Sequence, residues 1–465
     1  MILKQLTASV SCLFGAATGL VFITGCQTYE PKPLDLTSHR QHWYSRTTSD
    51  EDVRKFAMSL ISIDSPRHTE FNPVDGLTLS EGEIVALVFN PDLRMARLRA
   101  SVTQATAPFA GRWQDPNFNL NILKIAESIP DPWYISSSLS LTIPISGRLN
   151  SEKLLAASEV NAELERIAES EWNVLRNLRE IWLSWSANQL KMEQTEAIIH
   201  ELDAIVESTT LLAESGELLK TEAILFAIER ETRRTELERI KADLAEEAQN
   251  IRSLLGLSPK APLELQPSLS IQSTVSEAAS IEDRNPTLSR LRSEYEVAER
   301  TLHREIRKQY PDLTVGPQME SDEGQSRIGF IGGIPLPILN SNRGGIAEAR
   351  AERDLARAAS ETAYERITGH LAGLRTRLHG IHIRRASMET TIVPMVDQQL
   401  TDAYQLLELG EGSSLVMLES FVRAYEVKLK LIDTQLEDSQ TQNAIHFLMG
   451  PSSNSTGTQN NNPIP

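Results

Sequence analysis

The hydrophobic and polar positions of the chain follow two different periods, and each period predicts a different kind of element. Apolar residues recur every three or four positions from Ser151 to about Ser215, with no proline or glycine between them. This pattern predicts one helix of roughly 65 residues, about 95 Å long. In residues 117–122 and 135–143 apolar residues instead alternate with Asn, Ser or Thr, which predicts strands with one apolar and one polar face.

The same two periods predict the remaining elements. Ser80 and Glu83 are expected to form a capping box at the start of the first helix. Pro91 is expected to kink or restart that helix, and Pro394 to kink the second long one. The predicted helices are 82–110, 217–256, 281–309, 346–409 and 412–449, and the further strands are 312–319 and 327–336.

The order of these elements occurs twice along the chain. Four pairs of local signals recur at a spacing of 193 to 195 residues: Asn90-Pro91 with Asn285-Pro286, Pro144 with Pro337, Gly216-Glu217 with Gly410-Glu411, and Leu255-Gly256 with Met449-Gly450. Four matches in the same order predict an internal duplication. The first repeat is expected at 77–258, a connector at 259–280 and the second repeat at 281–450. In each repeat, one long helix is expected to lie antiparallel to two shorter ones stacked end to end.

The first 25 residues have the pattern of an export signal. Lys4 precedes an apolar run that ends in Ile23-Thr24-Gly25-Cys26. This boundary resembles the lipobox of bacterial lipoproteins, so residues 1–25 are expected to be a lipoprotein signal peptide and Cys26 to carry the lipid. Gln27 favours the outer membrane under the usual sorting rule. The alternative is an uncleaved membrane anchor. Residues 26–76 are expected to be an extended lipidated tether, and residues 451–465 a disordered tail.

Composition and motifs exclude several classes of function. The net charge of −17 and the lack of a basic run argue against nucleic acid as a partner. Apart from Cys26 the chain has only Cys12, inside the expected signal peptide, so no disulfide is predicted. His379 and His382 could share a metal ion, and His370 lies nearby in the sequence, but this spacing is also that of solvated helix histidines. We therefore predict no metal site, no cofactor and no enzyme.

Four amphipathic strands per chain suggest a shared structure. A membrane barrel needs at least eight strands, and open strand edges are not tolerated in lipid. If these strands span a membrane, several chains must contribute to one barrel. Asn117, Asn119 and Asn121 alternate with apolar residues in the first strand and are expected to face its water-filled lumen.

Over about Leu77–Gly450 the sequence resembles the TolC-like outer membrane efflux proteins. The resemblance is carried by Asn90-Pro91-Asp92-Leu93-Arg94, by residues 110–116 and 335–344, and by the Gly-Glu turns at 216 and 410. It implies a mainly helical homotrimer, with a twelve-stranded β-barrel in the outer membrane that continues as a twelve-helix periplasmic α-barrel. Such a tube passively conducts substrates delivered by an inner-membrane pump and a periplasmic adaptor protein. The alanine-rich long helices look most like those of heavy-metal and multidrug efflux members.

The resemblance also implies roles for the two helical turns. In the family, the periplasmic tips contact the adaptor and close the pore with acidic side chains. Carried onto this chain, the tips contain Gly216, Glu217, Gly410 and Glu411. Some members have two acidic residues three apart just past the second turn, and here those positions hold Val416 and Glu419. Only Glu419 is retained, and ordinary solvated helix charges are the alternative for all three glutamates.

Two other functions fit parts of the pattern. A lipid-anchored periplasmic coiled-coil scaffold would explain the long helices and the lipobox, but not the strand pairs that interrupt them twice. An exit duct for secreted proteins would share the channel architecture. The type of pump encoded beside the chain would separate that duct from an efflux channel.

Overall fold

The computed structural model of this 465-residue chain describes residues 28–61, 71–124, 126, 132–270, 280–322, 325–409 and 413–451. The chain divides into two compact units, residues 1–45 and 46–465. In the first unit, helix α2 (Leu36–Tyr44) begins at Asp35, whose carboxylate accepts the N–H groups of Thr37 and Ser38. The expected signal peptide, Cys26 and residues 452–465 lie outside the described residues.

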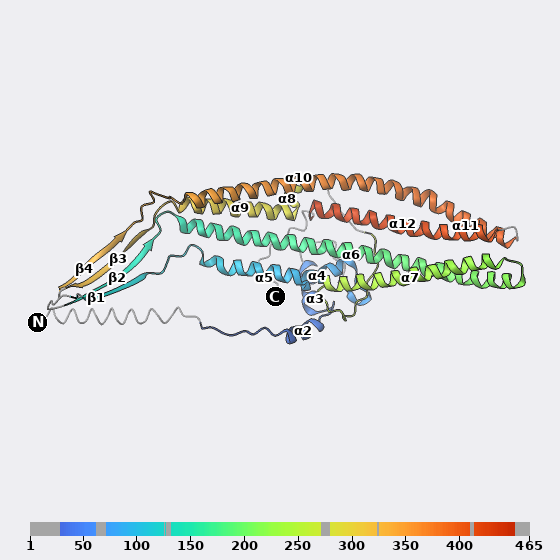
Figure 1. Ribbon diagram of the computed structural model, residues 1–465, viewed down its shortest axis with the longest axis horizontal. Helices are drawn as coiled ribbons and strands as arrows, with labels where there is room; N and C mark the ends of the chain where they lie inside the picture. The colour runs from blue at the N-terminus through green and yellow to red at the C-terminus, as the bar shows by residue number, and fades with distance from the viewer. Residues whose placement is uncertain are drawn as a thin grey trace. The chain divides into compact units, whose positions relative to one another are not determined.

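The second unit is mainly helical, as its periodicity predicted (Figure 1). The predicted helix at 151–215 is one continuous helix, α6. The helices of the second unit are α3 (Glu51–Ile61), α4 (Leu79–Phe89), α5 (Pro91–Thr106), α6 (Arg148–Ser215), α7 (Lys220–Leu254), α8 (Ile281–Arg284), α9 (Pro286–Arg307), α10 (Arg343–Ser387), α11 (Val393–Glu408) and α12 (Ser414–Met449). None of the helices in the described ranges is both long and apolar enough to cross a bilayer.

Three local predictions need correction or refinement. The capping box of α4 is formed by Thr78 and Glu81, two residues earlier than the expected pair of Ser80 and Glu83. The same spacing fits both registers, and Glu81 also accepts the N–H of Asn72 at 2.7 Å, while Glu83 pairs with Arg179. Residues 26–76 are not simply extended, because α2 and α3 lie among them. The second long helix is interrupted at Met388–Ile392 by a π-helical turn, directly before the Val393-Pro394 pair, since Pro394 has no N–H to continue the α-helical pattern.

A single antiparallel sheet joins the two repeats. Its strands are β1 (Asn117–Lys124), β2 (Trp133–Ile143), β3 (Leu313–Asp322) and β4 (Gln325–Gly333), in the order β1-β2-β3-β4. Gly316 of β3 lies so close to β2 that a Cβ there would be 1.8 Å from the carbonyl oxygen of Leu139. Glycine is therefore needed where the strand pairs of the two repeats meet.

The helices of the second unit follow the same order as the strands, with first-repeat helices on one side and second-repeat helices on the other. Next to the sheet, α6 contacts α5 and α9, and α9 contacts α10. Further along, α6 contacts α7 and α12, and α12 contacts α11. One lateral edge of the chain therefore consists of first-repeat elements (β1, α5, α7), and the other consists of second-repeat elements (β4, α10, α11).

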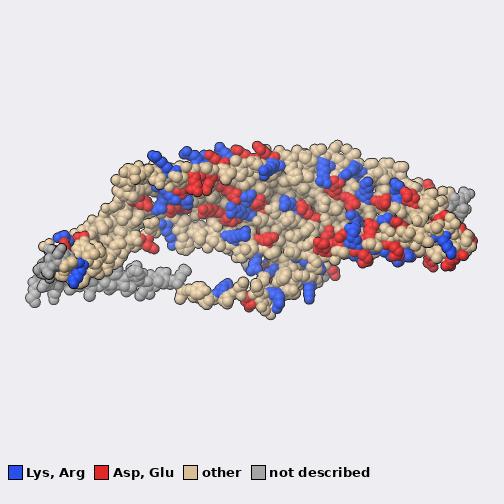
Figure 2. All heavy atoms as spheres, in the orientation of Figure 1, with Lys and Arg blue, Asp and Glu red and all other residues tan. Residues whose placement is uncertain are grey.

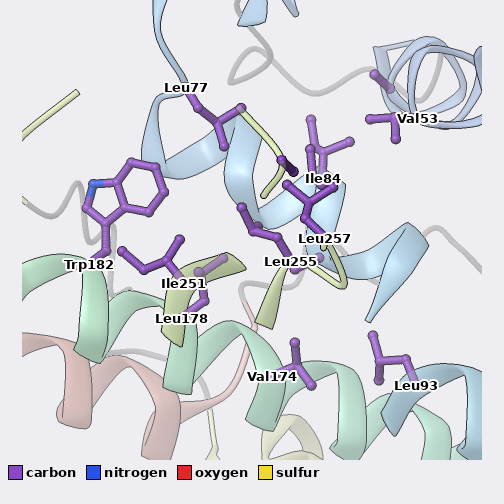
Figure 3. Packing of buried hydrophobic residues seen from close by; sticks show 14 residues of the cluster. Val53, Leu77, Ile84, Leu93, Val174, Leu178, Trp182, Ile251, Leu255 and Leu257 are labelled. Carbon is purple, nitrogen blue, oxygen red and sulfur yellow. The ribbon is translucent and has the colours of Figure 1, made fainter. Parts of the chain in front are cut away.

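The largest buried cluster lies where α4 and the end of α7 meet α6 (Figure 3). Trp182 of α6 is fully buried there, and its indole N–H donates to the carbonyl oxygen of Gln266 at 3.2 Å. Gly82 of α4 makes room for that ring, since a Cβ at this position would lie 3.0 Å from it. Burial of this many apolar side chains holds the middle of the first repeat together.

The duplication is visible in one recurring junction. Asn90 and Asn285 are both buried, and each precedes the proline that starts α5 or α9. The side-chain oxygen of each accepts N–H groups of the new helix. The side-chain amide of Asn90 donates to the carbonyl oxygen of Leu254 at 2.8 Å, and that of Asn285 to Leu448 at 2.9 Å. Each asparagine thus caps one helix and ties it to the last helix of its own repeat.

Candidate functional site

The strand register gives the sheet two chemically different faces. Asn117, Asn119 and Asn121 pair with Ser140, Ser138 and Ser136 across β1 and β2, so these side chains share one face. Since side chains alternate along a strand, the intervening residues lie on the opposite face. The polar face further includes Thr142, Thr314, Gln318, Glu320 and Arg327.

The opposite face is apolar and exposed. Phe118 is opposite Leu139, Leu141 is opposite Val315, and Met319 is opposite Ile328, so apolar residues face one another between each pair of neighbouring strands. Ser137, between Leu120 and Met319, is a polar exception on this face. Phe118 is 64 % exposed, Ile328 81 % and Phe330 85 %. A sheet of a water-soluble domain would bury such a face on a core, whereas a membrane barrel turns it towards lipid.

The strand lengths and edges also suit a membrane barrel. The four strands have 8, 11, 10 and 9 residues, and about 9–11 tilted residues suffice to cross a bilayer. In the described part of the chain, β1 and β4 each pair along one edge only. Each edge strand thus leaves a row of backbone N–H and C=O groups able to pair with another chain.

The first helical turn has the geometry predicted for Gly216. This residue ends α6 with a positive φ of 85°, which side chains other than glycine rarely adopt. The carbonyl oxygen of Leu212 accepts the N–H groups of Gly216, Glu217 and Leu218. Glu217 is exposed at the turn. The hydroxyl of Ser414 donates to Glu222, so the start of α12 lies beside the start of α7.

The second turn is only partly described. Gly410 and Glu411 lie outside the described residues. Glu419 lies on α12, exposed, and forms an ion pair with Arg423 at 2.7 Å on the same helix. That hydrogen bond raises the pKa of Arg423. Val416, the other position of the expected acidic pair, is 52 % exposed.

Sequence reasoning missed a set of exposed leucines around both turns. Leu219 is 66 % exposed and Leu409 is 74 % exposed. Exposed apolar side chains beside a turn are typical of a docking surface. The sequence feature that could have predicted this set is the pair of adjacent leucines on each side of Gly216. The set is Leu211, Leu212, Leu219, Leu409 and Leu415.

The histidines do not form a metal centre within the described ranges. His382 lies 3.3 Å from the carboxylate of buried Asp438, which also binds Arg385 at 2.9 Å. His379 lies exposed on α10. No group of three or more potential ligands is found among the residues that the structure describes.

Comparison with known proteins supports the fold. No protein-family model matches the chain. The cobalt-zinc-cadmium resistance protein CzcC of Cupriavidus metallidurans is 25 % identical to it over 173 residues, which cover 36 % of this chain and 41 % of that protein. The match therefore spans less than half of the relative's length.

Two solved structures are similar over most of their length. CusC, described for the folding of a transmembrane channel, matches with a TM-score of 0.70 and 14 % identity, over 84 % of this chain and 96 % of that one. The outer membrane protein VceC of Vibrio cholerae matches with a TM-score of 0.67 and 18 % identity, over 80 % and 96 %.

The chain has the fold of the TolC-like outer membrane efflux proteins, as the resemblance in sequence led us to expect. Three further similar structures, OprN, CmeC of Campylobacter jejuni and MtrE of Neisseria gonorrhoeae, are described as outer membrane channels and not as enzymes.

Proposed function

We propose that this protein is the outer membrane channel of an efflux system. It passively conducts substrates that an inner-membrane pump delivers through a periplasmic adaptor protein. The observation that carries the proposal is the four-stranded sheet. It has one exposed apolar face and one polar face, and in the described residues its two edge strands each pair on one side only. On this proposal the apolar face contacts outer membrane lipid, and Asn117, Asn119 and Asn121 face the lumen.

The internal duplication supports a head-to-tail ring of copies. Inside the chain, the first repeat meets the second through β2 with β3, α6 with α9, and α6 with α12. The equivalent contacts between copies join β4 to β1, α10 to α5, and α11 to α7 of the next copy. Such a heterologous contact closes into a ring when the rotation fits.

The exposed face of α5 agrees with this assembly. In α9, Arg290 and Ser293 contact Glu169 and Asn161 of α6. The positions 195 residues earlier are Met95 and Leu98 of α5, which are about half exposed. With Val102 they form an apolar stripe on α5 that nothing covers in the described part of a single chain.

We further propose three copies. Three copies are what the resemblance to TolC-like proteins implies, and they would supply twelve strands, above the eight that a small membrane barrel needs. Cys26 carries the lipid anchor, and the long helices form the periplasmic extension. The exposed leucines at the two turns, with Glu217 and Glu411, form the surface for the adaptor.

Selectivity is assigned to the pump rather than to this tube. The polar face of the sheet carries mostly neutral Asn, Ser and Thr side chains. Its charged residues are Glu320, Asp322 and Arg327. Arg327 lies opposite Glu320 and pairs with Asp322 at 3.6 Å, so it offsets one of the two carboxylates. Opposite charges in one row cancel much of each other's field. CzcC is named for cobalt, zinc and cadmium resistance, and metal ions are therefore the first substrates to test.

Pore formation tests this function directly. The full-length mature protein, purified from outer membranes, is added to a planar lipid bilayer. We expect discrete conductance steps. If no steps appear although the protein retains its helical circular dichroism spectrum, the result would contradict the channel and favour the lipid-anchored scaffold. A metal efflux assay in cells then distinguishes efflux of metals from efflux of other solutes.

A further inference from the structure

The end of the second repeat is capped by an arginine. Helix α12 ends at Gly450, which has a positive φ of 80°. The side chain of Arg284 donates to the carbonyl oxygens of Gly450 at 3.0 Å and Pro451 at 2.8 Å. Helix ends leave carbonyl oxygens without partners, and a cation there also compensates the negative end of the helix dipole.

The first repeat has no arginine at the equivalent position. Arg284 directly precedes Asn285, whereas the residue before Asn90 is Phe89, whose side chain cannot donate a hydrogen bond. A residue distant in the sequence nevertheless donates a hydrogen bond to the end of the first repeat. The side chain of Arg46 donates to the carbonyl oxygen of Gly256 at 3.0 Å. Its guanidinium also lies over the ring of Phe89, 5.1 Å from the centroid, an arrangement that favours a cation.

Arg46 is held in place by the residues that follow it. Asp50 accepts the N–H and the hydroxyl of Thr47, at 3.2 and 2.6 Å, before α3 begins. Val53 and Ala57 of α3 are 0 % and 2 % exposed and belong to the main buried cluster with Ile84 (Figure 3). Residues 46–61 therefore pack as part of the first repeat.

We propose that residues 46–61 are a clamp on the first repeat, in which Arg46 is a positioning residue that supplies the cap Arg284 supplies in the second repeat. The clamp fixes the end of α7 against the junction of α4 and α5. In the second repeat the corresponding donor is Arg284, which directly precedes Asn285. This inference does not rest on the channel proposal, and its test does not involve conductance.

Hydrogen–deuterium exchange of the full-length protein in detergent tests the clamp. Arg46→Ala is expected to speed amide exchange in residues 89–94 and 252–257 by about tenfold or more, and to leave 284–289 and 446–450 unchanged. Arg284→Ala is expected to show the reverse. Arg54→Ala, which changes an exposed arginine of α3, is the matched control and is expected to change neither junction.

A rescue variant sharpens the test. Phe89→Arg places an arginine where the second repeat has Arg284, so adding it to Arg46→Ala is expected to restore slow exchange at 252–257. Unchanged exchange in Arg46→Ala, or an equal increase in both repeats, would overturn the proposal. A failure of the rescue would contradict the equivalence of Arg46 with Arg284.

Discussion

Helices α5 and α9 occupy the same place in the two repeats but have different surroundings. Both follow a buried asparagine and begin with proline. Helix α9 lies between α6 and α10, and it contacts α6 through polar side chains, with Asn161 donating to Ser293 at 3.1 Å. Helix α5 contacts α6 as well, but its opposite side exposes Met95, Leu98 and Val102.

On the proposed ring of copies, this difference marks the surfaces that a single chain leaves uncovered. Each repeat offers a surface to the next, and inside the chain that surface is used only once, between the first and second repeats. The helices and the sheet also differ in charge, because acidic and basic side chains are interspersed over the helices while the sheet is mostly uncharged in the view of Figure 2. The predictions below test whether the two repeats are equivalent and whether the exposed edges meet.

The largest expected effect is on assembly. Leu98→Asp combined with Val102→Asp places charges in the stripe of α5 and is expected to abolish the oligomer, because a buried unpaired carboxylate costs several kcal/mol. Gln104→Asp is the control, since Gln104 is also exposed on α5 but lies about half a turn away from Met95. Size in detergent solution measures the result. An oligomer unaffected by the double variant would show that α5 does not face a second copy.

The next largest effect concerns the glycines at the two junctions. A Cβ at Gly256 would lie 2.0 Å from the carbonyl oxygen of Phe89, and one at Gly450 would lie 2.3 Å from that of Arg284. Both glycines have positive φ. We expect Gly256→Ala and Gly450→Ala each to lower the free energy of unfolding by roughly 2–4 kcal/mol.

Gly147→Ala separates strain from steric clash in this test. Gly147 has a similar φ of 74° but no atoms within 4 Å of the added Cβ, so we expect a loss of only about 1 kcal/mol. Thermal unfolding followed by circular dichroism compares the three variants. Equal losses at Gly147 and Gly256 would mean that the close approach to Phe89 is unimportant.

The junction asparagines are expected to matter equally. Asn90→Ala and Asn285→Ala each remove a helix cap and a buried hydrogen bond to the last helix of the repeat, at an expected cost of about 1–3 kcal/mol. Replacement by aspartate keeps the cap but places a buried carboxylate oxygen against the carbonyl oxygen of Leu254 or Leu448, and is expected to cost at least as much as alanine. Chemical unfolding of all four variants provides the comparison, and a large effect in one repeat only would contradict the equivalence of the junctions.

A smaller effect is expected at the second turn, where Glu419 and Arg423 form an ion pair. If these residues line a pore, Arg423→Ala exposes three symmetry-related carboxylates and is expected to shift conductance towards cations. Glu419→Ala is expected to shift it the other way. Reversal potentials in a salt gradient measure both shifts. Identical potentials in the two variants would show that this pair does not face the permeating ions.

The smallest effect is on pH dependence. The hydrogen bond from Arg377, with another from Arg384, lowers the pKa of Glu437. A carboxyl whose pKa is lowered by folding contributes stability above its unfolded pKa, and that contribution is lost as the pH falls through the folded pKa. We therefore expect the α10–α12 contact to weaken in acid. Glu437→Gln is expected to make the free energy of unfolding depend less on pH in the acid range. An unchanged pH dependence would show that Glu437 does not cause the loss of stability.

The sequence predicted the helices and strands much better than the contacts between them. Period alone was enough for α6 and the strands, because a residue's face follows directly from its position in a helix or strand. The recurrence of the Asn90-Pro91 pair as Asn285-Pro286, with the other repeated signals, predicted the duplication. The register of the capping box at Thr78 was missed, since Ser80 and Glu83 have the same spacing.

The contacts between distant segments could not be predicted. Arg46 and Gly256 are 210 residues apart, and no local pattern marks them as partners. For the same reason the sequence did not show that residues 51–61 pack on α4. The polar face of the strands was predicted from alternation, but the alignment of Asn117 with Ser140 depends on strand register, which tertiary packing decides.

The measurement that tests the central claim most directly is the mass of the mature protein. It is extracted from outer membranes in mild detergent and analysed by native mass spectrometry, with bound lipid and detergent taken into account. Our account predicts three copies in one particle, held by their lateral edges. A monomer that leaves the membrane without detergent once Cys26 is replaced by serine would contradict it.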